Sequence, residues 1–138
     1  MKLGVLALSL LFVTSGQAAQ DDVKKELDKL QGDWAISSFN GEAVPAEAEA
    51  YLVFTGDKYA QRTGNQVDER GTIKLDIKTK PMKIDLIITE GGDAGKTQLG
   101  VYEVTADTMT ISLATPGETG RPVALYQGAL NVVLEKAK

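Results

Sequence analysis

The 138-residue sequence contains no histidine and no cysteine, and these two absences exclude most familiar enzyme mechanisms. Without histidine, the chain has neither the commonest general base nor the commonest zinc ligand. It also cannot form a Ser-His or Cys-His nucleophile pair. Without cysteine, the fold has no disulfide and depends on its hydrophobic core for stability. We therefore predict a protein that is not an enzyme and that carries no cofactor.

The remaining acid–base groups are carboxylates, lysines and four tyrosines, and they form no obvious catalytic cluster. Asp68 and Glu69 are adjacent in a predicted strand, where neighbouring side chains point to opposite faces, so they should not share a site. Asp21 and Asp22 stand where they can cap the N-terminus of a helix. No stretch has the carboxylate spacing of a calcium-binding loop, and we predict no metal site.

Charge is almost absent from the first nineteen residues, where Lys2 is the only charged side chain. Leu3 to Val13 form an apolar run of the length found in signal peptides, too short for a transmembrane helix of about 20 residues. Gly16 and Ala18 can occupy the small-residue positions of a cleavage site. We predict that residues 1–19 are a signal peptide, cleaved near Ala18 or Ala19, and that no transmembrane anchor is present.

The predicted exported protein, residues 20–138, is long enough for one domain. Loss of Lys2 leaves 14 basic and 19 acidic side chains, a net charge of −5. Nucleic acids and anionic membrane surfaces bind basic patches, so neither is an expected partner. We expect a soluble protein in the periplasm or outside the cell.

The apolar residues change period along the chain. Val23, Leu27 and Leu30 recur at helical spacing and predict a short helix over residues 21–30. From Trp34 onward, apolar and polar residues alternate, which is typical of antiparallel strands with one buried face. The predicted strands are residues 33–39, 50–55, 58–63, 67–77, 82–89, 97–105, 108–114 and 129–136. Short turns rich in glycine, asparagine and aspartate separate most of them.

Eight strands joined by short turns favour an all-β, antiparallel, up-and-down barrel, with the short helix covering one end. An open meander of this length would leave two unpaired edges and a bare apolar face, and closure removes both. A two-sheet sandwich has the same alternation and is the alternative.

The stretch EGGDAGKTQLG, Glu90 to Gly100, superficially resembles a phosphate-binding loop. That motif requires a glycine five residues before Gly95, where this chain has Glu90. Thr97 to Thr105 also have the composition of a strand, whereas the motif leads into a helix. We interpret the stretch as a hairpin connection and predict no nucleotide binding.

Four segments together resemble an uncharacterised lipocalin-like domain family that recurs in secreted planctomycete proteins. They are Leu-Gln-Gly-Asp-Trp at Leu30–Trp34, Lys-Pro-Met-Lys-Ile-Asp-Leu at Lys80–Leu86, Gly-Lys-Thr-Gln-Leu-Gly-Val-Tyr at Gly95–Tyr102, and Arg121-Pro122. The family pattern has a basic residue where this chain has Met82, and isoleucine where it has Val101. The resemblance covers nearly all of residues 20–138 and implies a fold, but no activity.

The resemblance also implies structural roles for Gly32 and Trp34. In lipocalins, the tryptophan of this Gly-x-Trp motif closes the base of the barrel beside a basic residue. Here Lys136 or Arg121 can supply that cation–π partner.

The predicted function is non-catalytic binding of a small apolar or amphipathic ligand inside the barrel. The candidate ligand-binding residues are Ile73, Leu75, Ile84, Leu86, Leu99, Val101, Ile111 and Leu113, with Arg121 to orient a ligand carboxylate. Bulky isoleucine and leucine in a short chain favour a filled core instead. A structural or protein-binding role, with an outer patch around Val53, Ile87 and Val133, is therefore the alternative.

Overall fold

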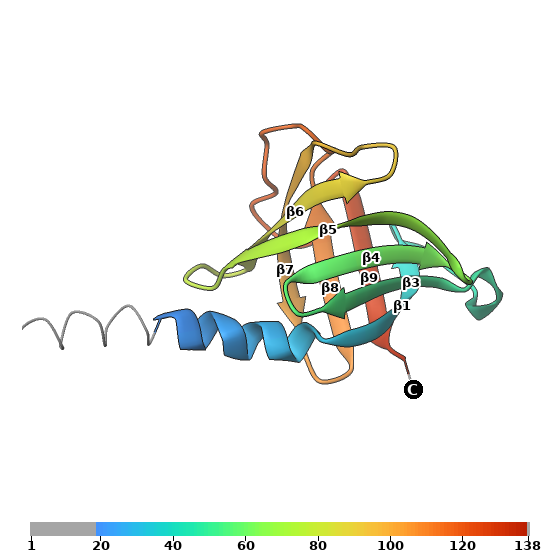
Figure 1. The fold of residues 1–138 in the computed structure, drawn as a ribbon, viewed down its shortest axis with the longest axis horizontal. Coiled ribbons are helices and arrows are strands. Elements are labelled where there is room, and N and C mark those ends of the chain that lie inside the picture. The colour runs from blue at the N-terminus through green and yellow to red at the C-terminus, as the bar shows by residue number, and fades with distance from the viewer. Residues whose placement is uncertain (1–18, 138) are drawn as a thin grey trace, which may run out of the picture.

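The computed structural model describes residues 19–137, which form a β-barrel with a helix at one end (Figure 1). Residues 19–30 are helical. The strands are β1 (Gly32–Phe39), β2 (Glu42–Ala43), β3 (Ala50–Thr55), β4 (Lys58–Thr63), β5 (Gln66–Asp76), β6 (Met82–Glu90), β7 (Thr97–Val104), β8 (Thr108–Leu113) and β9 (Leu130–Lys136), with the 3-10 helix η1 at Ala46–Ala48.

Eight antiparallel strands close the barrel in the order of the chain. From β3 to β9, each strand pairs with the next, and β1 pairs with both β3 and β9. The two-residue β2 adds only a short pairing to the end of β1. The predicted all-β, up-and-down, lipocalin-like barrel with a short N-terminal helix is thus confirmed, and the predicted strands match the observed ones to within a few residues.

The predicted helix boundary differs from the structure. Residues 19 and 20 are already helical, so Asp21 and Asp22 lie inside the helix rather than at its cap. Most of the predicted signal peptide, residues 1–18, lies outside the described residues.

The strand connections define two ends of the barrel, which we call the base and the mouth. The base carries the turns at residues 56–57, 77–81 and 105–107 together with the helix, whereas the mouth carries the connections at 40–49, 64–65, 91–96 and 114–129. The first turn at the mouth is Asn40-Gly41, with φ of 50° and 84°. Positive φ at both central residues is characteristic of the tight hairpin turn that asparagine–glycine pairs favour.

The base is closed by Trp34, which is fully buried. Its indole N–H donates to the Leu30 carbonyl at 2.8 Å, which ties the helix end to β1. Lys136 Nζ lies 4.7 Å from the centre of the Trp34 ring and also donates to the Gln31 carbonyl. Of the two basic residues considered from the sequence, Lys136 is therefore the cation–π partner.

Gly32 allows this arrangement at the base. Its φ is +108°, and a Cβ there would lie only 3.0 Å from Lys136 Nζ. A side chain would therefore disfavour both the backbone conformation and the approach of Lys136 to Trp34. Gly32 and Trp34, for which the family resemblance implied structural roles, thus lie together at the base.

The helix contributes a buried carboxylate to the base. Glu26 is only 6% exposed; its Oε1 accepts from the Tyr102 hydroxyl at 3.2 Å, and its Oε2 lies 3.0 Å from Lys29 Nζ. Burial, together with the nearby Glu26 carboxylate, raises the pKa of Tyr102 well above its usual value. Tyr102 therefore stays a neutral donor, and the buried charge has the partners it needs.

Candidate functional site

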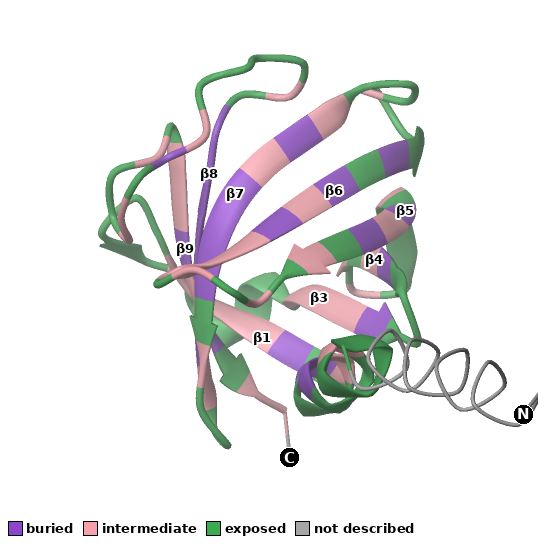
Figure 2. Ribbon diagram, turned by 90° about the vertical axis from the view of Figure 1, so that its left-hand side faces the viewer, coloured by how far each residue is buried: buried purple, intermediate pink, exposed green. Residues whose placement is uncertain are grey.

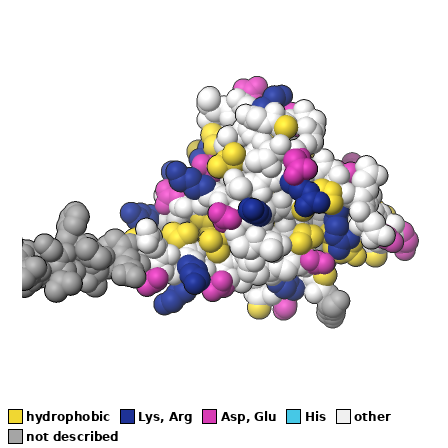
Figure 3. Space-filling model, viewed as in Figure 1, with side chains coloured by type: hydrophobic (Ala, Val, Ile, Leu, Met, Phe, Trp, Pro, Cys, Tyr) yellow, Lys and Arg dark blue, Asp and Glu magenta, His cyan; other side chains and the backbone are white. Residues whose placement is uncertain are grey.

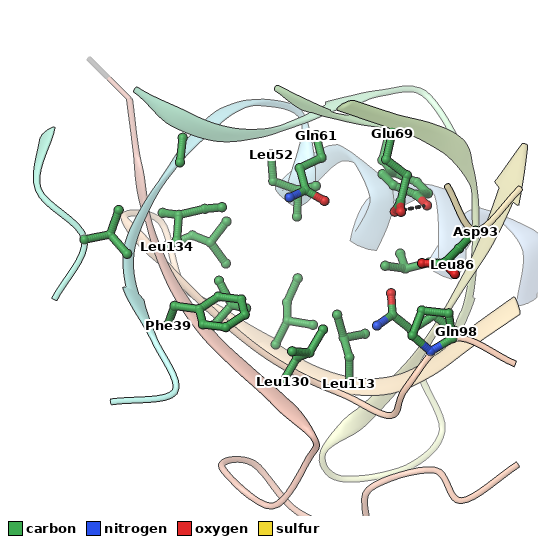
Figure 4. Close-up of a pocket in the computed structure, with 17 residues that line it drawn as sticks. Phe39, Leu52, Gln61, Glu69, Leu86, Asp93, Gln98, Leu113, Leu130 and Leu134 are labelled. Atoms are coloured by element: carbon green, nitrogen blue, oxygen red, sulfur yellow. Dashed lines mark hydrogen bonds between the residues drawn. The ribbon is translucent and has the colours of Figure 1, made fainter. Parts of the chain in front are cut away.

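The mouth half of the barrel contains a cavity of about 470 Å³, within the range of small-molecule sites. The base half, by contrast, is filled. There, large side chains meet in the middle, among them Trp34, Phe54, Tyr102 and Met109. Figure 4 shows the cavity as an open ring of side chains that point inward from the strands.

One side of the cavity is apolar. Its lining includes Ile36, Phe39, Leu52, Ile111, Leu113, Leu130, Val132 and Leu134, from β1, β3, β8 and β9. Phe39 reaches the inner face because β1 has an irregularity between Ile36 and Ser38, after which Phe39 pairs with the inward-facing Val132. A bulge of this kind shifts the alternation by one residue, so simple period-two reading of β1 would place Phe39 outside.

The other side of the cavity is polar. Its lining comprises Tyr59 and Gln61 on β4, Glu69 on β5, Asp93 in the β6–β7 connection and Gln98 on β7. In Figure 4, Glu69, Asp93 and Gln98 lie together beside Leu86, across the cavity from Phe39 and Leu134. Inside this part of the barrel, a polar wall thus faces an apolar one.

Hydrogen bonds hold four of these polar side chains. The Tyr59 hydroxyl donates to Glu69 Oε2 at 2.9 Å, and Gln98 Nε2 donates to the Ala114 carbonyl at 2.9 Å. Asp93 Oδ1 accepts from Lys96 Nζ at 3.2 Å in an exposed ion pair. Burial, followed by the hydrogen bond to Glu69, raises the pKa of Tyr59 well above its usual value, so Tyr59 remains a neutral donor.

The predicted ligand-binding residues fall into three groups. Leu86, Ile111 and Leu113 line the cavity. Ile73 and Ile84 are buried in the core, and Leu75 packs against it half-buried. Leu99 and Val101, by contrast, lie on the outer face of β7, because their neighbours Gln98 and Gly100 pair with the inward-facing Leu86 and Ile84.

The alternation of β7 therefore has the opposite phase to the expected one. Its inward residues are Gln98, Gly100 and Tyr102, which are not uniformly apolar, and Val101 is buried on the outer face. The segment at residues 114–129 explains why the outer face resembles a core face. Its Tyr126 N–H donates to Ser112 Oγ at 2.7 Å, and Ser112 pairs with Val101 across β7 and β8.

Arg121 lies on the outside of the barrel, not in the cavity. Its guanidinium donates to the Gly100 carbonyl at 2.9 Å and to Asp85 Oδ1 at 2.7 Å, and it also contacts the Ile84 carbonyl. It thereby fastens the 114–129 segment to β6 and β7. The expected role of Arg121 in orienting a ligand carboxylate is replaced by this structural role.

Sequence reasoning did not find the polar wall. Glu69 was considered only with Asp68, and the structure agrees that the two diverge, since Asp68 instead accepts from Thr63 Oγ1 at 2.7 Å. Gln98 could have been identified from the strand pairing, because it lies directly opposite the inward-facing Leu86 on the next strand. Asp93 could not be identified in this way because it lies in a loop.

The outer surface carries charges of both signs. On the face shown in Figure 3, lysine and arginine side chains are interspersed with aspartate and glutamate. Of the apolar residues proposed for an outer patch, Ile87 is 39% exposed, whereas Val53 and Val133 are half-buried. The burial pattern in Figure 2 likewise alternates along the strands, as expected for a wall with one inner and one outer face.

No group of three or more carboxylates suited to a metal ion occurs within residues 19–137. No helix in that range is long and apolar enough to span a membrane. Comparisons of the chain with family models, with curated proteins and with solved structures find no match. Membership of the lipocalin-like family that the sequence resembles therefore stays a prediction.

Proposed function

We propose that this protein binds a small amphipathic molecule in the mouth half of its barrel and does so without catalysis. The observation that carries the proposal is the cavity of about 470 Å³ with one apolar and one polar wall. Unfilled space of this size is unusual in a close-packed protein interior. An occupant would bury the apolar wall, while the polar wall would determine its orientation.

The absence of catalysis is supported by the groups that line the cavity. Within the described residues, its titratable side chains are Tyr59, Glu69 and Asp93, and Tyr59 is held neutral by burial and by its bond to Glu69. None of them is a nucleophile activated by an adjacent base. We propose further that the protein acts after export, as the apolar segment at Leu3 to Val13 suggests.

A plug in the cavity tests the proposal. Val132 lines the cavity, whereas its neighbour Val133 lies on the outer face of the same strand. The probe is N-phenyl-1-naphthylamine, a neutral dye that fluoresces in apolar surroundings. Val132→Phe should weaken dye binding by about tenfold or more, and Val133→Phe should leave it unchanged.

Ala50→Phe is a second plug, because Ala50 lines the mouth of the cavity from β3. Unfolding curves of all three variants control for the cost of overpacking, about 1–3 kcal/mol. Binding that survives both plugs, or no dye binding to the unaltered protein, would overturn the proposal. The second result would favour a structural or protein-binding role, in which Val123 and Tyr126, 82% and 64% exposed, would be the first residues to test.

A further inference from the structure

On Tyr59, Glu69, Asp93 and Gln98, the free hydrogen-bonding atoms are acceptors, whereas Gln61, which also lines the cavity from β4, has an amide that can both donate and accept. The Tyr59 hydroxyl proton is already donated to Glu69 Oε2, and Gln98 Nε2 already donates to the Ala114 carbonyl. Glu69 Oε1 and Asp93 Oδ2 have no donor among the described residues. A carboxylate oxygen can only accept, so a ligand group placed against Glu69 and Asp93 has to bring its own donors.

Gln98 gives an independent indication of the same requirement. It is only 4% exposed, and its Oε1 has no hydrogen-bond donor among residues 19–137. Every side-chain N or O atom that is sealed from solvent in the described structure has a partner, so this oxygen must be reachable from the cavity. Figure 4 shows the Gln98 amide pointing into the cavity beside Leu86 and Asp93. A buried acceptor without a donor is costly unless a ligand or water supplies one.

The cavity also has an unbalanced charge. Two carboxylates line it, and no lysine or arginine does. The side chain of Lys96 is half-exposed and does not line the cavity. It pairs with Asp93 Oδ1 and leaves Asp93 Oδ2 free. Arg121 forms an ion pair with Asp85, and Arg62 forms one with Asp33; neither arginine lines the cavity. The polar wall is therefore anionic and lacks an internal cation.

We infer that the ligand of this cavity carries a protonated amine, whose N–H groups bind Glu69, Asp93 and Gln98 while its apolar body covers the opposite wall. The inference rests on the proposed binding function. A protonated primary amine supplies three donors and a positive charge to three free acceptors, two of them charged. A ligand carboxylate would meet two like charges, with only the exposed Gln61 amide as a donor, and should bind more weakly.

An inorganic cation fits the cavity less well than an organic one. Calcium takes six to eight oxygen ligands, whereas this wall offers two carboxylates and two side-chain amides. A metal ion would also leave the wall formed by Phe39, Leu113 and Leu130 exposed to water. An aliphatic or aromatic amine satisfies both walls at once.

Three probes with the same tail and different head groups test the inference: decylamine, decan-1-ol and decanoate. Each displaces N-phenyl-1-naphthylamine from the purified protein at neutral pH and low salt. Decylamine should bind about tenfold more tightly than decan-1-ol, because hydrogen bonds to charged acceptors are stronger than neutral ones. Decanoate should be the weakest of the three.

The double variant Glu69→Gln/Asp93→Asn removes both charges while keeping the shape of the wall. It should lower the affinity for decylamine to about that for decan-1-ol and leave the alcohol and the dye unaffected. Glu103→Gln/Asp107→Asn is the matched control, since it removes the same charge from exposed positions near the base. Decylamine should bind this control as it binds the unaltered protein.

The possible results separate this inference from the proposed function. If decan-1-ol or decanoate binds as tightly as decylamine, and Val132→Phe blocks all three, then the cavity binds ligands and the amine inference is overturned. The same conclusion follows if both double variants weaken decylamine equally, because the effect is then general attraction to an acidic protein. If neither the dye nor any probe binds, the proposed function itself is overturned.

Discussion

The base and the mouth of this barrel are built from the same strands but differ in what fills them. In the base, Trp34, Phe54 and Tyr102 are almost completely buried and meet in the middle. At the mouth, the inward residues are mostly leucine, isoleucine, valine and polar side chains, and Phe39 is 43% exposed. Alternation decides which side chains point inward, but their volumes, layer by layer, decide whether they fill the space.

This division suggests separate roles for the two ends. The base has a helix, a cation–π contact and a satisfied buried carboxylate, so it should provide most of the stability. The mouth has an anionic wall with free acceptors, which contributes little to packing. Groups that a fold does not use for its own stability are the ones available to a ligand.

The largest expected effect comes from truncating one aromatic residue of β1 at each end. Trp34→Ala should lower the free energy of unfolding by about 3–5 kcal/mol, because it leaves a cavity in the base. Phe39→Ala should cost about 1 kcal/mol or less, because Phe39 is 43% exposed. Urea unfolding monitored by circular dichroism measures both. Equal costs, or a nearly neutral Trp34→Ala, would contradict the division.

Alkaline pH should lower the free energy of unfolding by less than Trp34→Ala does, through one buried tyrosine in each half of the barrel. The pKa values of Tyr59 and Tyr102 are raised in the folded protein from an ordinary value of 10.0. Above about pH 10, the unfolded chain therefore binds fewer protons than the folded one, and stability falls as pH rises, by at most about 1.4 kcal/mol per pH unit for each tyrosine. Below that pH, both tyrosines carry their proton in the folded and in the unfolded chain, so neither makes the stability depend on pH.

Urea unfolding at pH 8 and pH 11 measures this loss. Tyr59→Phe and Tyr102→Phe should each reduce it, since phenylalanine has no proton to lose. Tyr126→Phe, at a tyrosine that is 64% exposed, serves as the matched control. A loss that is identical in the unaltered protein and in the two buried-tyrosine variants would show that other groups cause it.

The barrel itself could be predicted because its signals are local. Alternating residues and turn pairs such as Asn40-Gly41 repeat along the chain, and each strand pairs with the next one. A basic partner for Trp34 was implied only by the family resemblance, which left Lys136 and Arg121 as alternatives. The contact at 4.7 Å with Lys136 decides between them.

The lining of the cavity could be predicted only in part, for Leu86, Ile111 and Leu113, because the rest depends on non-local features. The 114–129 segment covers the outer face of β7, so Val101 is buried there although it points outward. An apolar residue at this position therefore looks like an inward one in the sequence. The irregularity in β1 brings Phe39 inside. Glu69, Asp93 and Gln98 come from three separate segments, and only closure of the barrel brings them to one wall.

The smallest expected effect concerns Arg121, which joins the 114–129 segment to the barrel. Arg121→Gln removes the bonds to Asp85 and to the Gly100 carbonyl and should lower stability by about 1 kcal/mol, because the group is partly exposed. Hydrogen exchange should become faster at the Tyr126 amide, whose partner Ser112 lies beneath that segment. Dye binding in the cavity should not change, because Arg121 does not line it. If Arg121→Gln instead weakens dye or decanoate binding while stability and exchange stay the same, then Arg121 orients the ligand, as expected from the sequence. It would then not be the residue that fastens the 114–129 segment to the outside of the barrel.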